Sequence, residues 1–331
     1  MVIFCAKRDT HRVWTLSNFD FKHVFLKENR INKQGKNIHN NLDVLGYLKR
    51  FNPDIVITTG FNPTHLYSWF FAKLYNKIHI PMTDGWLGSE TNLSPVHKII
   101  RKIVFYSSDA FIGAGLKSKE LFESYGIKPS SIFRSHLCID NNIFLKKAIN
   151  KHRRYHLMFS GQFIDRKMPL FFAEVVHKIT KSIPHLSVLI LGDGPLKTDF
   201  LNKLKEYHIN YTYAGFISQE KLPQYYSSSK LFLFPTKTDA WGIVANEALA
   251  SGTPVLVTPY AGIVDDLVYD GYNGFVMDPN VDLWSKKSIE LLNDTNLLRK
   301  LSRHAILSVE NFTFENAAQG IIKACNFAYS S

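Results

Sequence analysis

Residues 231–257, LFLFPTKTDAWGIVANEALASGTPVLV, decide the fold of this chain. The apolar run at 231–234 predicts a buried strand, and the apolar run at 255–257 predicts a second one. Between them a short helix is expected over residues 242–251, because Gly252 stops it. Such a strand–helix–strand unit predicts a parallel sheet with the helix N-terminus at its carboxyl edge, where anionic ligands bind.

Two carboxylates stand out in this unit. Glu247 lies four positions after Ile243 and three after Val244, so it shares their apolar helix face, where an unpaired carboxylate is costly. Asp239 lies eight positions before Glu247, in the loop that faces the same helix end. Taken singly, each carboxylate could have a purely structural role. Asp239 would then cap the helix N-terminus, and Glu247 would form an ion pair on the helix. Together with Gly242, which allows close backbone approach, they predict a donor site for a phosphorylated, polyhydroxylated ligand.

This segment resembles the donor-site signature of family 4 glycosyltransferases, which are retaining enzymes of the GT-B fold. That signature has two acidic residues eight apart, an aromatic–Gly pair after the first acid, and a later small-Gly-x-Pro-Val strand. The matching pair here is Trp241 and Gly242, and residues 250–255 (ASGTPV) and 270–274 (DGYNG) match the later motifs. The first acid is Asp239 where the family has Glu, and the aromatic is Trp where the family has Phe.

The resemblance implies an α/β protein with two doubly wound Rossmann-like domains facing across a cleft, and alternating apolar and amphipathic stretches agree with it. We expect an acceptor-side domain over residues 1–144, a linker over 145–154, a nucleotide-sugar-binding domain over 155–310 and a C-terminal helix over 311–331. The Gly-rich loop that the family carries after its first strand is missing, so the first domain is N-terminally short or starts further upstream.

A second constellation lies between a strand expected at 155–159 and a helix expected from Pro169, and it contains Gly161, Gln162, Arg166 and Lys167. Cationic side chains beside a helix N-terminus stabilise a diphosphate leaving group as the sugar–phosphate bond breaks. The resemblance assigns this role to Lys167, whereas the Arg of the family pattern is Gln162 here. Arg166 is either the substitute cation or a solvated loop charge.

Further donor contacts follow from the resemblance. Phe216 and Ile217 come after a strand end where the family places main-chain contacts to the nucleobase, and Trp241, Ile243 and Val244 surround the helix start. With Gly161, Gln162, Arg166, Gly242 and Glu247, they form the expected donor-binding set.

The acceptor side offers one candidate. Relatives often place a His near the reacting sugar, whereas this chain has Asp84 after a strand in that region, so Asp84 is nominated with Asp239 and Lys167 as a catalytic residue. The chain shows no Asp-x-Asp pair and no cluster of His, Cys and carboxylates with metal-ligand spacing. We therefore expect no metal and no cofactor beyond the nucleotide diphosphate-sugar donor.

The bulk composition bounds location and partners. The 331 residues include 40 Lys and Arg against 28 Asp and Glu, a formal net charge of +12, without a recognised nucleic-acid-binding module. Residues 95–106 (PVHKIIRKIVFY) alternate basic and apolar positions, which predicts either a helix on an anionic membrane surface or a core-facing helix with a solvated basic face. Three scattered cysteines without paired or metal-ligand spacing indicate buried thiols in a reducing compartment. The expected location is cytoplasmic, peripheral at the inner face of a membrane.

These patterns predict a retaining glycosyltransferase that moves a sugar from a nucleotide diphosphate-sugar to a hydroxyl of a lipid-linked saccharide in surface polysaccharide (for instance lipopolysaccharide) biosynthesis. Two alternatives stay open: a catalytically weak or inactive GT-B-fold scaffold subunit, and a GT-B nucleotide-sugar epimerase. The scaffold gains weight from Asp239 in place of Glu and Gln162 in place of Arg. Neither sugar, base, acceptor nor linkage can be read from the sequence.

Overall fold

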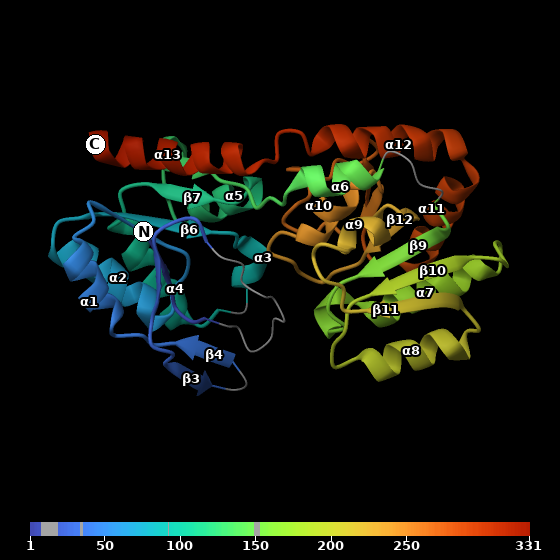
Figure 1. Ribbon diagram of the computed structural model, residues 1–331, viewed down its shortest axis with the longest axis horizontal. Helices are drawn as coiled ribbons and strands as arrows, with labels where there is room; N and C mark the ends of the chain where they lie inside the picture. The colour runs from blue at the N-terminus through green and yellow to red at the C-terminus, as the bar shows by residue number, and fades with distance from the viewer. Residues whose placement is uncertain (8–18, 34–35, 92, 149–152) are drawn as a thin grey trace.

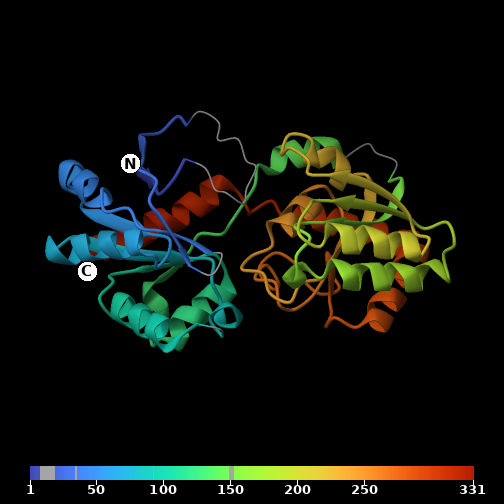
Figure 2. The ribbon, with the colours of Figure 1, turned by 90° about the horizontal axis from the view of Figure 1, so that it is seen from below.

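The computed structural model describes residues 1–7, 19–33, 36–91, 93–148 and 153–331, and it shows two α/β units side by side (Figure 1, Figure 2). A four-stranded sheet lies at the centre of the first unit and a six-stranded sheet at the centre of the second. Neighbouring strands are parallel throughout both sheets. The predicted α/β class is confirmed.

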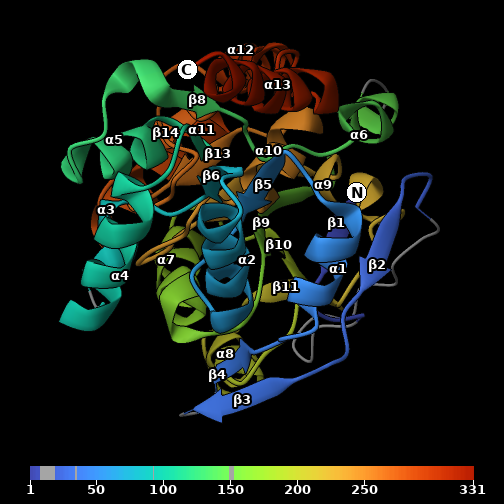
Figure 3. The same cartoon turned by 90° about the vertical axis from the view of Figure 1, so that its left-hand side faces the viewer.

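The first unit has the strand order β5-β6-β7-β8. Its strands and the helices between them are β5 (Ile55–Thr58), α2 (Pro63–Leu74), β6 (Ile78–Thr83), α3 (Leu87–Glu90), α4 (Pro95–Tyr106), β7 (Phe111–Gly113), α5 (Leu116–Ser124) and β8 (Ile132–Arg134). Ahead of them come the parallel pair β1 (Val2–Phe4) and β2 (His23–Phe25), the strands β3 (Arg30–Lys33) and β4 (Lys36–His39), and helix α1 (Val44–Phe51). The antiparallel pair β3–β4, which no sequence pattern predicted, extends away from the sheets (Figure 3).

The second unit has the strand order β11-β10-β9-β12-β13-β14. Its elements are β9 (Tyr155–Ser160), α7 (Pro169–Thr180), β10 (Ser187–Leu191), α8 (Lys197–Glu206), β11 (Asn210–Gly215), α9 (Leu222–Tyr226), β12 (Ser229–Phe234), α10 (Ile243–Ala250), β13 (Val255–Val257), β14 (Gly274–Val276), α11 (Val281–Asn293) and α12 (Thr295–Ser308). In chain order this is the Rossmann arrangement 3-2-1-4-5-6, so the strand order reverses between β9 and β12. Ligands bind outside the carboxyl ends of the strands at such a point.

Strand β12 shows why the second sheet forms from these residues. Leu231 and Leu233 pack into the core on one face, whereas Phe232 and Phe234 pack into the core on the other. Successive side chains point to opposite faces of a strand, and both faces here are covered, so the strand is apolar at every one of these positions. The buried strand predicted at 231–234 is confirmed.

Two segments between and after the sheets depart from the expectation. Helix α6 (Asn141–Ala148) begins before the expected linker and extends into it. It packs on α9 and α10 of the second unit, and Phe144 lies in the core of that unit. The expected linker over 145–154 is therefore helical at its start, and residues 149–152 lie outside the described part. Helix α13 (Phe314–Ser330), at the position of the expected C-terminal helix, returns to the first unit and packs on β6, β7 and β8 (Figure 1).

Close contact explains how α13 fits there. A Cβ on Gly320 would lie 1.9 Å from the carbonyl oxygen of Arg134, so only glycine lets the helix approach β8 this closely. Ala324 and Ala328 then pack against Ile80 and Ile112 of the sheet. The chain end thus completes the core of the first unit. The three cysteines are free thiols, and each is partly buried rather than fully buried as predicted.

Candidate functional site

The loops that follow β9 and β12 meet at the point where the strand order reverses. The backbone carbonyl of Arg166, in the loop after β9, accepts hydrogen bonds from the Thr236 hydroxyl (2.9 Å) and the Lys237 amide (2.8 Å) in the loop after β12. The Lys237 ammonium also lies 2.7 Å and 2.8 Å from the two carboxylate oxygens of Asp165. The two loops, 72 positions apart in sequence, therefore form one surface.

Asp239 lies at the centre of this surface, flanked by both predicted cations. The Lys167 ammonium forms an ion pair with one carboxylate oxygen, and the Arg166 guanidinium lies 3.8 Å from the other. The side chains of Lys167 and Asp239 are only 12% and 14% exposed. Burial lowers the pKa of the Lys167 ammonium, and the carboxylate opposes that shift. The site holds two positive charges and one negative charge, with Lys167 and Asp239 largely desolvated and Arg166 more exposed, and the excess of positive charge suits an anionic ligand.

Helix α10 begins at this surface with an open N-terminus. Gly242 precedes the helix with a φ of 104°, and a Cβ there would lie 2.7 Å from the Phe234 ring, so glycine is required. Among the described residues no side chain caps this helix. Ile243 and Val244 pack their side chains on the core, so they offer backbone N–H groups of the first turn. Such groups and the helix dipole attract a phosphate.

Glu247 is buried in the middle of α10, as its position on the apolar face predicted. Burial raises the pKa of its carboxyl group to about 7, and a hydrogen bond from Tyr226 opposes the shift. The Tyr226 hydroxyl, itself fully buried, lies 2.8 Å from the hydroxyl of Ser160 at the end of β9. A chain of polar groups thus leads from the sheet edge to Glu247. Ser160 and Tyr226 were not predicted from the sequence. The only signal for them is that a buried Glu247 needs a hydrogen-bonding partner, which a hydroxyl on a neighbouring element can supply.

This burial predicts how Glu247 affects stability. Glu247→Gln is expected to stabilise the ligand-free protein more at about pH 8 than at about pH 5.5. Between the ordinary value of 4.5 and about 7 the folded protein takes up a proton that the unfolded chain lacks, so the contribution of Glu247 to stability falls as pH rises. Glutamine carries no such charge. Thermal denaturation of both proteins across this range measures the effect, with Glu220→Gln, at an exposed position, as control. A gain in stability from Glu247→Gln that does not change with pH would contradict the assignment.

The remaining donor-side residues lie along the same carboxyl edge. The amide of Gly161, after β9, donates to the carbonyl of Leu191 at the end of β10, and a Cβ on Gly161 would meet no atom within 4 Å. Gln162 is exposed beside it. Phe216 and Ile217 follow β11, with Phe216 exposed and Ile217 packed on the core. The structure places all four at the edge where the resemblance expected them, and their roles stay predictions.

The side chains of two predicted site residues, Trp241 and Asp84, make no contact with Asp239, Lys167 or Arg166 among the interactions described above. The Trp241 indole is buried beside Phe312, and a Cβ on Gly115 of the first unit would lie 2.8 Å from its ring. Its side chain therefore packs between the two units, and a contact with a donor would have to come from its backbone. Asp84 is exposed after β6 in the first unit, and its role stays a prediction. Within the described part of the chain, no group of three or more His, Cys, Asp or Glu could hold a metal ion.

Comparison of the sequence with known proteins identifies the family to which this chain belongs. The family model for glycosyl transferases group 1 matches residues 140–308, about half of the chain. The chain belongs to this family. The resemblance to glycosyltransferases predicted from the sequence is thereby confirmed. The matched residues include the donor-side elements described above, from β9 to α10.

Relatives of this group 1 glycosyl transferase support the same grouping. It is 26% identical over 263 residues to the alpha-monoglucosyldiacylglycerol synthase of Acholeplasma laidlawii, covering 78% of this chain and 61% of that protein. It is 28% identical over 303 residues to a sulfoquinovosyl transferase of Arabidopsis thaliana, covering 84% of this chain and 57% of that protein. The chain thus spans about three fifths of the length of these relatives.

The fold itself is that of solved GT-B glycosyltransferases. The Anabaena protein HepE, crystallised with UDP, superposes with a TM-score of 0.74 at 14% sequence identity, covering 86% of this chain and 81% of that protein. The predicted GT-B fold is confirmed. At this identity the likeness shows the fold alone.

Proposed function

We propose that this protein is a retaining glycosyltransferase that moves a sugar from a nucleotide diphosphate-sugar to a hydroxyl of an acceptor. The observation that carries the proposal is the Asp239 carboxylate held between Lys167 and Arg166, beside the open N-terminus of α10. A diphosphate placed there would meet two cations and the first-turn N–H groups of a helix. Glu247, buried one turn further along α10, would accept hydrogen bonds from the ribose hydroxyls.

The ion pair between Lys167 and Asp239 has a function in this proposal. An entering diphosphate competes for Lys167 and Arg166, and the Asp239 carboxylate becomes free to accept hydrogen bonds from hydroxyls of the donor sugar. As the sugar–phosphate bond breaks, negative charge grows on the leaving phosphate, and the two cations stabilise it. In the mechanism that the family resemblance implies, this phosphate takes the proton of the acceptor hydroxyl on the same face of the sugar, which retains the anomeric configuration. We propose that no metal is required, since these cations supply the positive charge.

Titration with nucleotide sugars tests the proposal. The UDP in the HepE structure makes uridine diphosphate sugars the first choice, with guanosine diphosphate sugars as the comparison. We expect one member of this panel to bind and to be consumed when a glycolipid acceptor is added. Binding without any turnover would favour the scaffold subunit, and interconversion of the donor sugar would favour the epimerase.

An exposed apolar face on the first unit supports a lipid-linked acceptor. Val96, Ile99, Ile103 and Tyr106 lie on one side of α4, and each side chain is more than half exposed. Helix α4 faces the core through Val104 and Phe105, so the support for the membrane alternative comes from its exposed apolar side chains. Phe70 and Leu74 of α2 are also mostly exposed, and Lys98 and Lys102 of α4 are exposed beside the apolar stripe. Apolar residues flanked by lysines match the surface of an anionic membrane.

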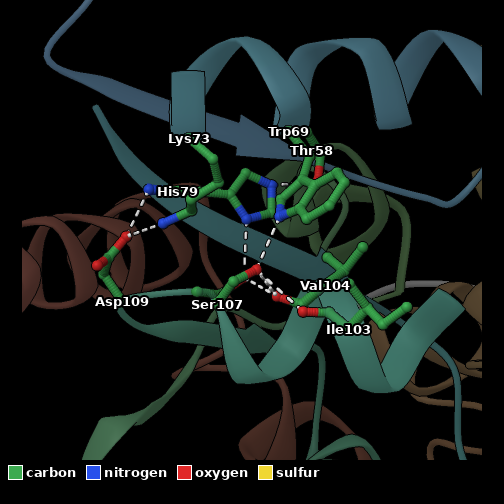
Figure 4. A network of polar contacts seen from close by, with 9 residues as sticks. Thr58, Trp69, Lys73, His79, Ile103, Val104, Ser107 and Asp109 are labelled. Atoms are coloured by element: carbon green, nitrogen blue, oxygen red, sulfur yellow. Dashed lines mark hydrogen bonds and ion pairs between the residues drawn. The ribbon is translucent and has the colours of Figure 1, made fainter. Parts of the chain in front are cut away.

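Polar contacts hold α2 and α4 in a fixed relation (Figure 4). The Trp69 indole of α2 donates to the Ser107 hydroxyl at the end of α4 (2.9 Å), and Lys73 of α2 pairs with Asp109 (3.0 Å). The same Asp109 carboxylate accepts from the backbone amide of His79 in β6 (2.8 Å). The His79 ring lies 3.0 Å from the Thr58 hydroxyl and 2.8 Å from the Ser108 hydroxyl, and burial lowers the pKa of the ring to about 3. The contact between Trp69 and Ser107 therefore places α2 beside the end of α4.

We propose that the exposed apolar residues of α2 and α4, together with Lys98 and Lys102, form a membrane face. This face rests on the inner side of a membrane and brings the site to a lipid-linked saccharide, as in surface polysaccharide biosynthesis. The name of the Acholeplasma relative, a glucosyldiacylglycerol synthase, is in keeping with such an acceptor. No helix in the described part of the chain is long and apolar enough to cross a membrane. Association through the membrane face would need no such helix.

Liposome co-sedimentation tests the membrane face. The protein is expected to bind vesicles that contain anionic lipids and to be released by high salt, because salt screens the attraction of the lysines. The double variant Ile99→Ser, Ile103→Ser should weaken binding roughly 10- to 30-fold through lost apolar burial. Ile322→Ser on α13, also at an exposed position, is the matched control and should bind normally. Equal binding to neutral vesicles, or binding that survives salt, would count against the proposal.

A further inference from the structure

A buried carboxylate joins the two units at the start of α5. The Asp266 side chain of the second unit is fully buried, and one of its oxygens accepts a hydrogen bond from the backbone amide of Leu116 (2.7 Å). The other oxygen accepts from the guanidinium of Arg134 at the end of β8 (3.1 Å). A Cβ on Gly115 would lie 2.1 Å from the Asp266 carboxylate, so glycine is needed for this approach. The first turn of α5 is thus held directly against the second unit.

Lys117, one residue further along α5, makes a second connection. Its ammonium donates to the backbone carbonyls of Pro259 (2.6 Å) and Ala261 (2.8 Å) in the second unit. It also lies 5.0 Å from the centre of the Trp86 ring of the first unit, within reach of a cation–π contact. Two charge-assisted hydrogen bonds to neighbouring carbonyls fix the path of the backbone between them.

That stretch of backbone, residues 259–262, supports Asp239. The amide of Asp239 donates to the carbonyl of Tyr260 (3.0 Å), and the amide of Gly262 donates to the carbonyl of Asp239 (2.9 Å). A Cβ on Gly262 would lie 1.8 Å from the carbonyl oxygen of Ala240, so the two stretches of chain are in close contact. A shift of residues 259–262 must therefore move the backbone of Asp239.

We propose that Lys117 and Asp266 are positioning residues that couple the packing of the two units to the place of the Asp239 carboxylate. This inference rests on the proposed function, in which Asp239 contacts the donor sugar. With the units packed, Lys117 holds residues 259–262, and these hold Asp239 beside Lys167. When the units separate, Lys117 withdraws, and the carboxylate loses its fixed position. The nucleotide contacts on α10 lie within the second unit and do not depend on Lys117.

The test is a comparison of turnover with nucleotide affinity. Lys117→Met keeps the apolar stem of the side chain but removes its hydrogen-bond donors, and we expect kcat to fall about 10- to 100-fold, as for other small misplacements of reacting groups. The dissociation constant of the nucleoside diphosphate, measured by calorimetry, should change less than about twofold, because only the sugar-contacting acid is displaced. Lys119→Met is the control: Lys119 lies on the same helix and pairs with Glu123, away from residues 259–262, so kcat should be unchanged.

The outcomes separate the two ideas. Full kcat in Lys117→Met, or equal losses of kcat and nucleotide affinity, would overturn the positioning role. Wild-type protein that neither binds nor consumes a nucleotide sugar would instead overturn the proposed function on which the role rests. Thermal denaturation accompanies each assay, and if Lys117→Met does not fold, Lys117→Arg is assayed in its place. The Arg variant keeps the charge but not the geometry, so a smaller fall in kcat with unchanged nucleotide affinity is expected.

Discussion

Replacing Lys167 with alanine is expected to lower the rate of sugar transfer about 10²- to 10³-fold, comparable to losing one preorganised charge stabiliser in other enzymes. The Lys167 ammonium is nearly buried beside Asp239, where its charge acts with little screening by water. The Arg166 side chain is 44% exposed, so water screens its charge more and Arg166 is less able to take over the role of Lys167. Lys167→Gln should not restore the rate, because a neutral amide cannot balance the charge of the leaving phosphate. Single-turnover measurements with saturating donor isolate this step.

The matched control is Arg166→Ala, which removes the more exposed of the two cations and should cost less than Lys167→Ala. Full activity in the Lys167 variant would move the phosphate role to Arg166 or to the backbone N–H groups of α10. A loss confined to donor affinity, with an unchanged rate at saturation, would show that Lys167 binds the diphosphate equally in the ground state and the transition state.

Substitutions of the two acids, Glu247 and Asp239, are expected to affect different properties: nucleotide affinity and turnover, respectively. At about pH 8, above the raised pKa of Glu247, Glu247→Gln should weaken binding of the nucleoside diphosphate by roughly 1.5–3 kcal/mol. This is the contribution of a charged hydrogen-bonding partner, because Glu247 contacts the ribose in our proposal. Asp239→Asn should depress turnover and leave that affinity nearly unchanged, since Asp239 contacts the transferred sugar. Removing the Asp239 charge also removes the competitor of the diphosphate for Lys167, which gives a further reason why affinity should not fall. Asp239→Glu restores the acid of the family pattern and is expected to be tolerated.

Calorimetry with the nucleoside diphosphate, alongside turnover assays, separates these cases. Identical affinity losses in Asp239→Asn and Glu247→Gln would contradict the division of labour. No loss of either property in either variant would contradict the donor site itself.

Much of the second unit was predictable from sequence because its signals are local. Buried strands were predicted at 231–234 and 255–257 from continuous apolar runs, and the intervening helix was predicted from its glycine boundary; all three are present as β12, β13 and α10. The burial of Glu247 followed from its spacing to Ile243 and Val244 alone. The β3–β4 pair was missed because its strands are short and polar.

The sequence by itself determined the fold family and the two acids, because strand runs, helix boundaries and an eight-residue spacing are properties of neighbouring residues. Only the tertiary structure decided that Lys167 pairs with Asp239 and that Tyr226 donates a hydrogen bond to Glu247. It also decided that α13 packs on the sheet of the first unit. It also decided that α4 turns Ile99 and Ile103 outward, which an amphipathic pattern left open. These contacts join residues far apart in the chain, and they depend on strand order and on how the two units pack, which no local pattern contains.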